Sequence, residues 1–225
     1  MNNTLKITHW FAGAALAFSL AGCASVSVKN VDTANTPFPP TGKPDVIYIM
    51  PFDVSSGEFN VDRQGAELAD FKQNLQQMMS AALTAEIPEH LVPAQAVNAV
   101  PGPGNAWLVS GRFVRVNQGS RLLRSTVGFG AGGTKMETQV SVYNLADNSS
   151  APFMTFDTTG GSGAAPGMIS AGPVGAAIGA VGGAAKGVTN DTARTSRMIT
   201  ASLSEYMYNH GWISKDQRLT PKMSE

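Results

Sequence analysis

The sequence has little of the chemistry from which enzyme and metal sites are usually built. Its 225 residues include one cysteine and three histidines, and only 14% of them are charged. A single cysteine excludes an intrachain disulfide, and so few histidines exclude the usual zinc site of His and Cys ligands. No G-x-S-x-G motif is present, and neither His90 nor His210 has a nucleophile or an acid beside it in the sequence. We therefore expect no catalytic residues, no metal and no cofactor, with a hydrolytic or small-ligand-binding domain as an alternative.

A net charge is also absent. The 16 Lys and Arg residues balance the 16 Asp and Glu residues. A protein that binds nucleic acid needs a basic patch or stripe to neutralise phosphates. We therefore expect no nucleic-acid partner.

The N-terminus has the three parts of a secretory signal. Lys6 supplies a positive charge, and residues 10–20 (WFAGAALAFSL) form an uncharged apolar stretch. That stretch is shorter than the roughly twenty residues that a membrane-spanning helix needs. The small residues Ala21 and Gly22 follow, as at a signal-peptide cleavage site. The sequence predicts a signal peptide over residues 1–22.

Leu20-Ala21-Gly22-Cys23 resembles the bacterial lipobox, L-[AS]-[GA]-C. The resemblance implies that Cys23 becomes the acylated N-terminus, so the only bound group we expect is a covalent lipid. Two or more acyl chains hold a protein stably on a membrane. Ala24 and Ser25 resemble the sorting signal for the outer membrane, because no aspartate follows the cysteine. We expect a protein anchored at the periplasmic face of the outer membrane, with residues 23–44, rich in Ser, Thr, Asn and Pro, as a flexible tether.

Apolar patterns predict a single α/β domain over residues 45–215, with a mixed or antiparallel sheet and two main helices packed on it. Residues 45–54 open the domain as a strand buried on both faces. Residues 135–145 alternate polar with apolar side chains, as in a half-exposed strand. Further strands are expected at residues 106–116 and, as a hairpin partner after a turn, at 153–157.

The two helices follow from spacing near 3.6 residues. Residues 65–87 place apolar side chains on one face, and Pro88 is expected to end this helix. Residues 190–210 form the second helix, with Gly211 at the position of a C-cap glycine. Residues 216–225 are expected to be a C-terminal tail.

Two sets of motifs resemble bacterial lipoprotein families. Residues 46–52 (VIYIMPF) and 107–113 (WLVSGRF) resemble a V-x-V-x-P-F strand and an L-V-x-G turn. These motifs are found in envelope lipoproteins that include the curli-secretion type and activators of peptidoglycan synthases. Residues 119–132 (GSRLLRSTVGFGAG) resemble the G-[NS]-R-x-x-R-x-x-[VI]-G-x-G-x-G segment of a lipoprotein family of unknown function. The resemblance implies the fold and the compartment, and no activity.

That segment also holds two candidate ligand residues. Arg121 and Arg124 could form an anion or partner contact, because a guanidinium fork pairs well with carboxylates; they could equally be solvated or paired within the domain. Gly128, Gly130 and Gly133 fit G-x-G-x-x-G, but nucleotide binding needs a helix after the motif, and a strand is expected there. We interpret these glycines as a loop.

Residues 160–187 form a glycine-rich insertion, and no charge lies between Asp157 and Lys186. Gly175, Gly179, Gly183 and Gly187 recur every four residues, which on a helix lines up a groove for close helix packing. Residues 174–185 would span about 18 Å as a helix, too short to cross roughly 30 Å of hydrocarbon. Three interpretations stay open: a flexible loop, a helix packing against another chain as a glycine zipper, or a segment dipping into the membrane.

These observations favour a non-enzymatic outer-membrane lipoprotein that acts as an accessory, assembly or scaffold factor of the cell envelope. Its expected partners are the membrane and an envelope protein or a second copy of itself. The alternative is a protein that self-assembles or inserts into membrane through the glycine zipper.

Overall fold

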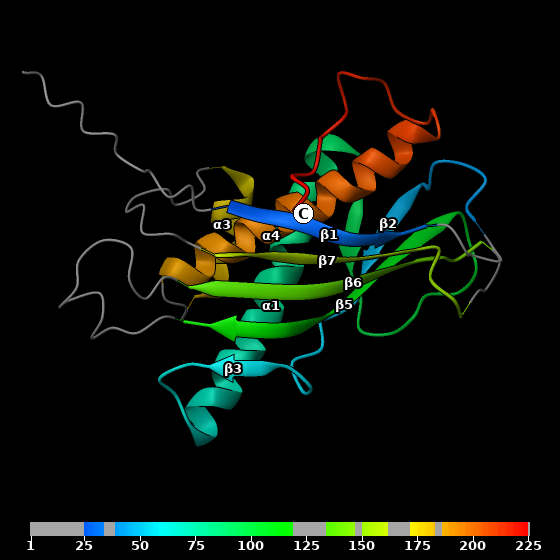
Figure 1. The fold of residues 1–225 in the computed structure, drawn as a ribbon. Helices are drawn as coiled ribbons and strands as arrows, with labels where there is room; N and C mark the ends of the chain where they lie inside the picture. Colours follow the sequence, from blue (N-terminus) through cyan, green and yellow to red (C-terminus); the bar gives the residue numbers. More distant parts are fainter. Residues whose placement is uncertain are drawn as a thin grey trace, which may run out of the picture.

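The computed structural model describes residues 25–33, 39–118, 134–146, 150–161, 172–182 and 186–224 (Figure 1). Within these residues the chain forms seven strands and three helices. The strands are β1 (Ser25–Asp32), β2 (Val46–Ile49), β3 (Glu58–Asn60), β4 (Ala94–Ala96), β5 (Ala106–Asn117), β6 (Lys135–Asn144) and β7 (Met154–Gly161). The helices are α1 (Gly65–His90), α3 (Pro173–Val181) and α4 (Lys186–Asn209).

The strands form one mixed sheet in the order β1-β7-β6-β5-β2-β4, with β3 paired to β5 beyond the end of β2. Neighbours from β1 to β5 are antiparallel, whereas β2 is parallel to both β5 and β4. The β6–β7 pair is the hairpin expected from the sequence. The α/β fold class with a mixed sheet and two main helices is confirmed, and α3 is an additional helix.

Helices α1 and α4 cover one face of the sheet, where the main core lies (Figure 1). The alternation in β6 sets this arrangement: Met136, Val140 and Val142 are buried on the helix side, while Lys135 and Gln139 are exposed on the other. On the second face, Ala106, Leu108 and Leu145 form a small apolar cluster with half-buried residues of β2. Strand β2 is shorter than predicted, and the predicted burial on both faces is confirmed only in part: Ile47 and Ile49 are buried, whereas Val46 and Tyr48 on the other face are half-buried.

The motifs of residues 46–52 and 107–113 meet at one contact. The Phe52 ring lies over Gly111 so closely that a Cβ on Gly111 would be 2.4 Å from the ring and 2.8 Å from the Gln139 carbonyl. Phe52 also packs on Phe113 at a ring-centroid distance of 5.9 Å. The L-V-x-G motif thus ends in glycine because an aromatic ring from the other motif occupies the space of a side chain.

The expectation of a flexible tether over residues 23–44 is wrong for its first part. Residues 25–32 form β1, an edge strand paired antiparallel to β7. Val26 and Val28 are buried against the core, whereas the residues that alternate with them are polar. This edge strand was missed because only two apolar side chains mark it within a stretch of polar composition.

The expected C-terminal tail also joins the sheet, at the outer edge of β1. The Val28 N–H donates to the Lys222 carbonyl at 2.7 Å, and the Ser224 N–H donates to the Val28 carbonyl at 2.9 Å. Two separate parts of the chain that read as polar tails therefore stabilise each other.

Helix α1 continues through Pro88 and ends at His90, so the predicted stop is wrong. A proline removes its own N–H from the helix ladder and its ring crowds the carbonyl four residues back, but here it falls in the last turn. Ile87 and Leu91 are buried, and the Leu91 N–H donates to the Ile87 carbonyl at 2.9 Å. Burial of these side chains holds the last turn in place.

Helix α4 begins at Lys186, four residues earlier than predicted, and ends as predicted. Ile199, Leu203, Tyr206 and Met207 are buried. Gly211 has φ +73°, and the Trp212 N–H donates to the Met207 carbonyl at 2.9 Å, which is the Schellman arrangement. The C-cap prediction for Gly211 is confirmed.

The glycine-rich insertion does not form one continuous helix. Gly175 and Gly179 lie in α3, which ends at Gly182 with φ +73°, and Gly187 lies in α4; Gly183 is outside the described residues. Val174 and Ile178 of α3 are buried in the chain's own core, against α1. The prediction of one helix groove lined by all four glycines is therefore wrong. Gly182, with its positive φ, ends α3 within the pattern, and α3 packs against α1 of the same chain.

We predict that Gly111→Ala lowers the free energy of unfolding by about 1–3 kcal/mol, the usual cost of overpacking a core. Neither the Phe52 ring nor the Gln139 carbonyl can withdraw without disturbing β5 and β6. Urea unfolding of the purified protein measures the change. Gly104→Ala is the matched control, because its Cβ would meet nothing within 4 Å; equal stability of the two variants would contradict the role given to Gly111.

We predict that Gly179→Ala raises the free energy of unfolding by roughly 0.5–1 kcal/mol, as alanine does inside helices. A Cβ there meets nothing within 4 Å, whereas at Gly187 it would lie 2.6 Å from Thr134 Cγ2. Gly187→Ala should therefore lower stability in the same unfolding assay. A loss of native mass in Gly179→Ala would instead indicate that this glycine packs against another chain.

Candidate functional site: an uncharged groove beside α1

Most of the residues that the sequence singled out lie outside the described residues. These are Arg121, Arg124, Gly183, and the lipobox residues Leu20, Ala21, Gly22 and Cys23. The segment with the two arginines begins after Gln118 and ends before Thr134. Gln118 accepts a hydrogen bond from Arg63 at 3.1 Å, and the Thr134 hydroxyl donates to the Asp191 carboxylate.

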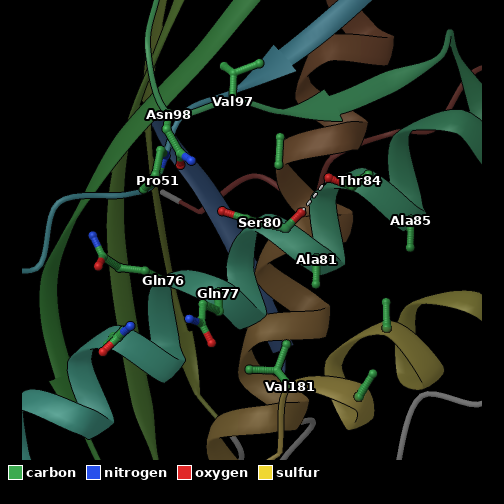
Figure 2. Close-up of a pocket in the computed structure, with 14 residues that line it drawn as sticks. Pro51, Gln76, Gln77, Ser80, Ala81, Thr84, Ala85, Val97, Asn98 and Val181 are labelled. Atoms are coloured by element: carbon green, nitrogen blue, oxygen red, sulfur yellow. Dashed lines mark hydrogen bonds between the residues drawn. The ribbon is translucent and has the colours of Figure 1, made fainter.

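A groove of about 790 Å³ lies over the middle of α1. Figure 2 shows Pro51 and Asn98 at one margin and Val181 of α3 at the other. None of its lining residues is charged. They are Pro51, Gln73, Gln76, Gln77, Ser80, Ala81, Thr84, Ala85, Ala96, Val97, Asn98, Ala177, Ala180 and Val181.

The groove follows the outward stripe of α1, opposite the face that is buried on the sheet. Successive turns bring Gln73, Gln77, Ser80, Ala81 and Thr84 to this side. The outer face of an amphipathic surface helix ordinarily has charged or polar side chains. Residues 73–85 contain no charge, which is the signal from which the sequence could have indicated a contact surface.

Two of the polar groups in the groove are used to build its walls. The Gln76 side-chain amide donates to the Phe52 carbonyl at 2.6 Å, and the Thr84 hydroxyl donates to the Ser80 carbonyl at 2.8 Å. Gln73, Gln77 and Asn98, by contrast, have no hydrogen-bond partner within the described part of the chain. Each free amide offers two donors and an acceptor, and a bound chain could use them.

Ala177, Ala180 and Val181 of α3 form the second wall. Helix α3 is positioned by Val174 and Ile178, which are buried against the core, so its other side is free to line the groove. Ala180 is exposed and lines the groove; Ala176, one turn earlier, is exposed and does not. The insertion thus contributes a small-residue surface to the groove.

The turn after Phe52 fixes the margin at Pro51. Asp53 accepts hydrogen bonds from the Ser55 hydroxyl at 2.7 Å and N–H at 2.9 Å, and from the Ser56 hydroxyl at 2.7 Å. The Ser55 hydroxyl foremost, together with the other donors, holds the pKa of Asp53 well below its usual range. The ionised carboxylate therefore stabilises this turn at neutral pH.

His90 and His210 both lie outside the groove. His90 lies 3.6 Å from Glu86, which also pairs with Arg197, so it belongs to a contact between α1 and α4. His210 lines a smaller pocket of about 300 Å³, and its Nδ1 lies 2.8 Å from the Tyr206 carbonyl.

That smaller pocket does not assemble a catalytic pair. Its carboxylate, Glu205, accepts two hydrogen bonds from Arg218 at 2.7 Å each. Its serine, Ser202, donates to the Met198 carbonyl at 2.9 Å instead of to the imidazole. Burial raises the pKa of the Tyr206 phenol, which makes it a weaker acid.

Across the described ranges no helix is both long and apolar enough to cross a bilayer. The same residues contain no cluster of three His, Cys, Asp or Glu side chains that could hold a metal ion. The groove itself has no group that titrates near neutral pH. Its lining offers amides, hydroxyls and small apolar side chains.

Comparison with known proteins gives a family and little else. No curated protein sequence matches the chain. Two solved structures of the PelC dodecamer from Paraburkholderia phytofirmans are distantly similar. The structure of a point variant has a TM-score of 0.34 and 8% sequence identity to this chain. The other structure has a TM-score of 0.33 and 9% sequence identity. Each match covers 76% of this chain and 97% of that chain.

A family model described as "Domain of unknown function (DUF4410)" matches residues 27–180, from within β1 to the end of α3. That match covers more than half of the chain, and the protein therefore belongs to this family of unknown function.

Proposed function

We propose that the protein is a non-enzymatic lipoprotein of the outer membrane that binds another envelope protein in the groove over α1. Its acylated Cys23 holds it at the periplasmic face, and the domain acts as an accessory or scaffold factor. The observation that supports binding is the groove itself, which has no charge and combines small apolar side chains with amides that have no partner among the described residues.

The partner that fits this groove is an uncharged protein segment. Burying a charged side chain without a partner is costly, and no ion-pair partner lines the groove. Gln73, Gln77 and Asn98 can instead donate to and accept from a peptide backbone. Alanines at four positions of α1 and α3 leave room for the partner's side chains.

The proposed anchor depends on the lipobox, which lies outside the described residues. We predict that Cys23→Ser moves the protein from the membrane fraction to the soluble periplasmic fraction, because one hydroxyl cannot replace two or more acyl chains. Intact-mass measurement of the wild-type protein should give the mass of residues 23–225 plus lipid. An unacylated mature wild type would contradict the anchor.

We predict that Ala180→Lys reduces partner binding at least about tenfold, which corresponds to 1.4 kcal/mol, because it places an unpaired charge in the groove. A photo-reactive amino acid at Gln77 should form an adduct with an envelope protein in cells. That adduct should be lost in Ala180→Lys.

Ala176→Lys is the matched control, since it adds the same charge to the same helix on an exposed site outside the groove. Its adduct should equal that of the wild type. An adduct that survives both substitutions, or that never forms, would contradict the groove as the partner site. An adduct of twice the chain mass would identify the partner as a second copy.

A further inference from the structure

Four strand ends lie level at one end of the sheet. Ser25 at the start of β1 pairs with Gly161 at the end of β7. In the adjacent pairs, Met136 near the start of β6 aligns with Gly160, and Lys135 aligns with Asn117 at the end of β5. We name this the anchor end, defined by Ser25, Gly161, Lys135 and Asn117; in Figure 1 it is the left end of the sheet, on the side of α3.

The anchor end is tied by covalent geometry to the proposed lipid. Ser25 follows Cys23 by two residues, and two residues of chain span at most about 7 Å. Strand β1 cannot peel away to lengthen this link, because Val26 and Val28 would leave the core and the pairs to β7 would break. The proposed lipid therefore joins the chain within about 7 Å of Ser25.

The described surface at this end suits a position at the headgroup layer. Residues 158–161 of β7 are uncharged. The charged side chains at the rim are paired with one another: Lys135, 46% exposed, contacts Glu137 at 2.8 Å, and Arg115 contacts Glu58 at 3.1 Å and Glu137 at 3.5 Å. Paired charges of both signs suit the zwitterionic and charged groups of that layer.

The anchor end is also closely packed. A Cβ on Gly161 would lie 1.9 Å from the Thr134 carbonyl oxygen, and one on Gly187 would lie 2.6 Å from Thr134 Cγ2. Both ends of the glycine-rich insertion thus pack on Thr134, which joins β7, β6 and α4 at this point. The orientation of the lipid-proximal strands is consequently passed on to the whole domain.

We propose that the domain sits directly on the bilayer with the anchor end facing lipid and the opposite end of the sheet pointing into the periplasm. This inference rests on the proposed acylation of Cys23. The domain then has a fixed orientation, in place of the free movement that a long flexible tether would allow. The start of β5 lies roughly 36 Å farther from the lipid than its end, at about 3.3 Å per residue.

Two single-cysteine variants test the orientation, because the acylated Cys23 leaves no other thiol in the mature chain. Lys135→Cys places a fluorophore at the anchor end, and Gly104→Cys places it just before β5, where a Cβ meets nothing within 4 Å. Both acylated proteins are bound to phosphatidylethanolamine–phosphatidylglycerol vesicles that contain a lipid with a quencher on its headgroup. We expect at least about twofold stronger quenching at 135, since the two positions lie roughly 36 Å apart along β5.

Equal quenching of the two labels on vesicle-bound protein would overturn the fixed orientation and leave the lipid anchor standing. Absence of acylated protein from the vesicles would instead overturn the anchor and the proposed function with it. A 20-residue Gly/Ser insertion between Ala24 and Ser25 serves as the reference for a free tether. Its mean reach of roughly 25 Å should remove the difference between the labels.

Discussion

The seating of the Phe52 ring on Gly111 is the contact on which the described structure most depends. It fixes the turn after β2 against the middle of β5, and the Phe52 carbonyl then accepts the Gln76 amide of α1. Sheet, turn and helix therefore meet at this residue pair, at the edge of the main core. Pro51, the groove margin, precedes that ring directly, so the shape of the binding surface depends on the same contact.

The composition of the groove is that of a protein contact surface, and it differs from that of a helix face exposed to water. A helix face exposed to water gains solubility from charges, whereas residues 73–85 of α1 have amides, hydroxyls and alanines. The α3 wall adds more alanine. Such a surface discriminates against charged ligands by the cost of burying an unpaired charge, and it selects a partner by shape and by hydrogen bonds to its backbone.

Periodicity predicted the elements whose two faces differ strongly. The alternation of β6 around Met136, Val140 and Val142, and the apolar face of α4 with Gly211 at its end, were both readable from the sequence. Strand β1 was not readable, because at a sheet edge only Val26 and Val28 need to be apolar. Only one wall of the groove could be predicted, from the uncharged residues 73–85. The other wall could not, since α3 meets α1 from about a hundred residues farther along the chain and its glycine pattern conceals the helix end at Gly182.

Strand β1 joins the proposed anchor to the fold, and its contacts suit that role. A pull on Cys23 acts along β1, and its hydrogen bonds to β7 run across the strand, so they are loaded together instead of one after another. The C-terminal segment adds two more bonds at Val28. That segment is itself fastened to α4, where Arg218 donates twice to Glu205. An anchored protein whose first strand bears load needs such reinforcement at an edge that would otherwise be the weakest part of the sheet, and the chain supplies it from its far terminus.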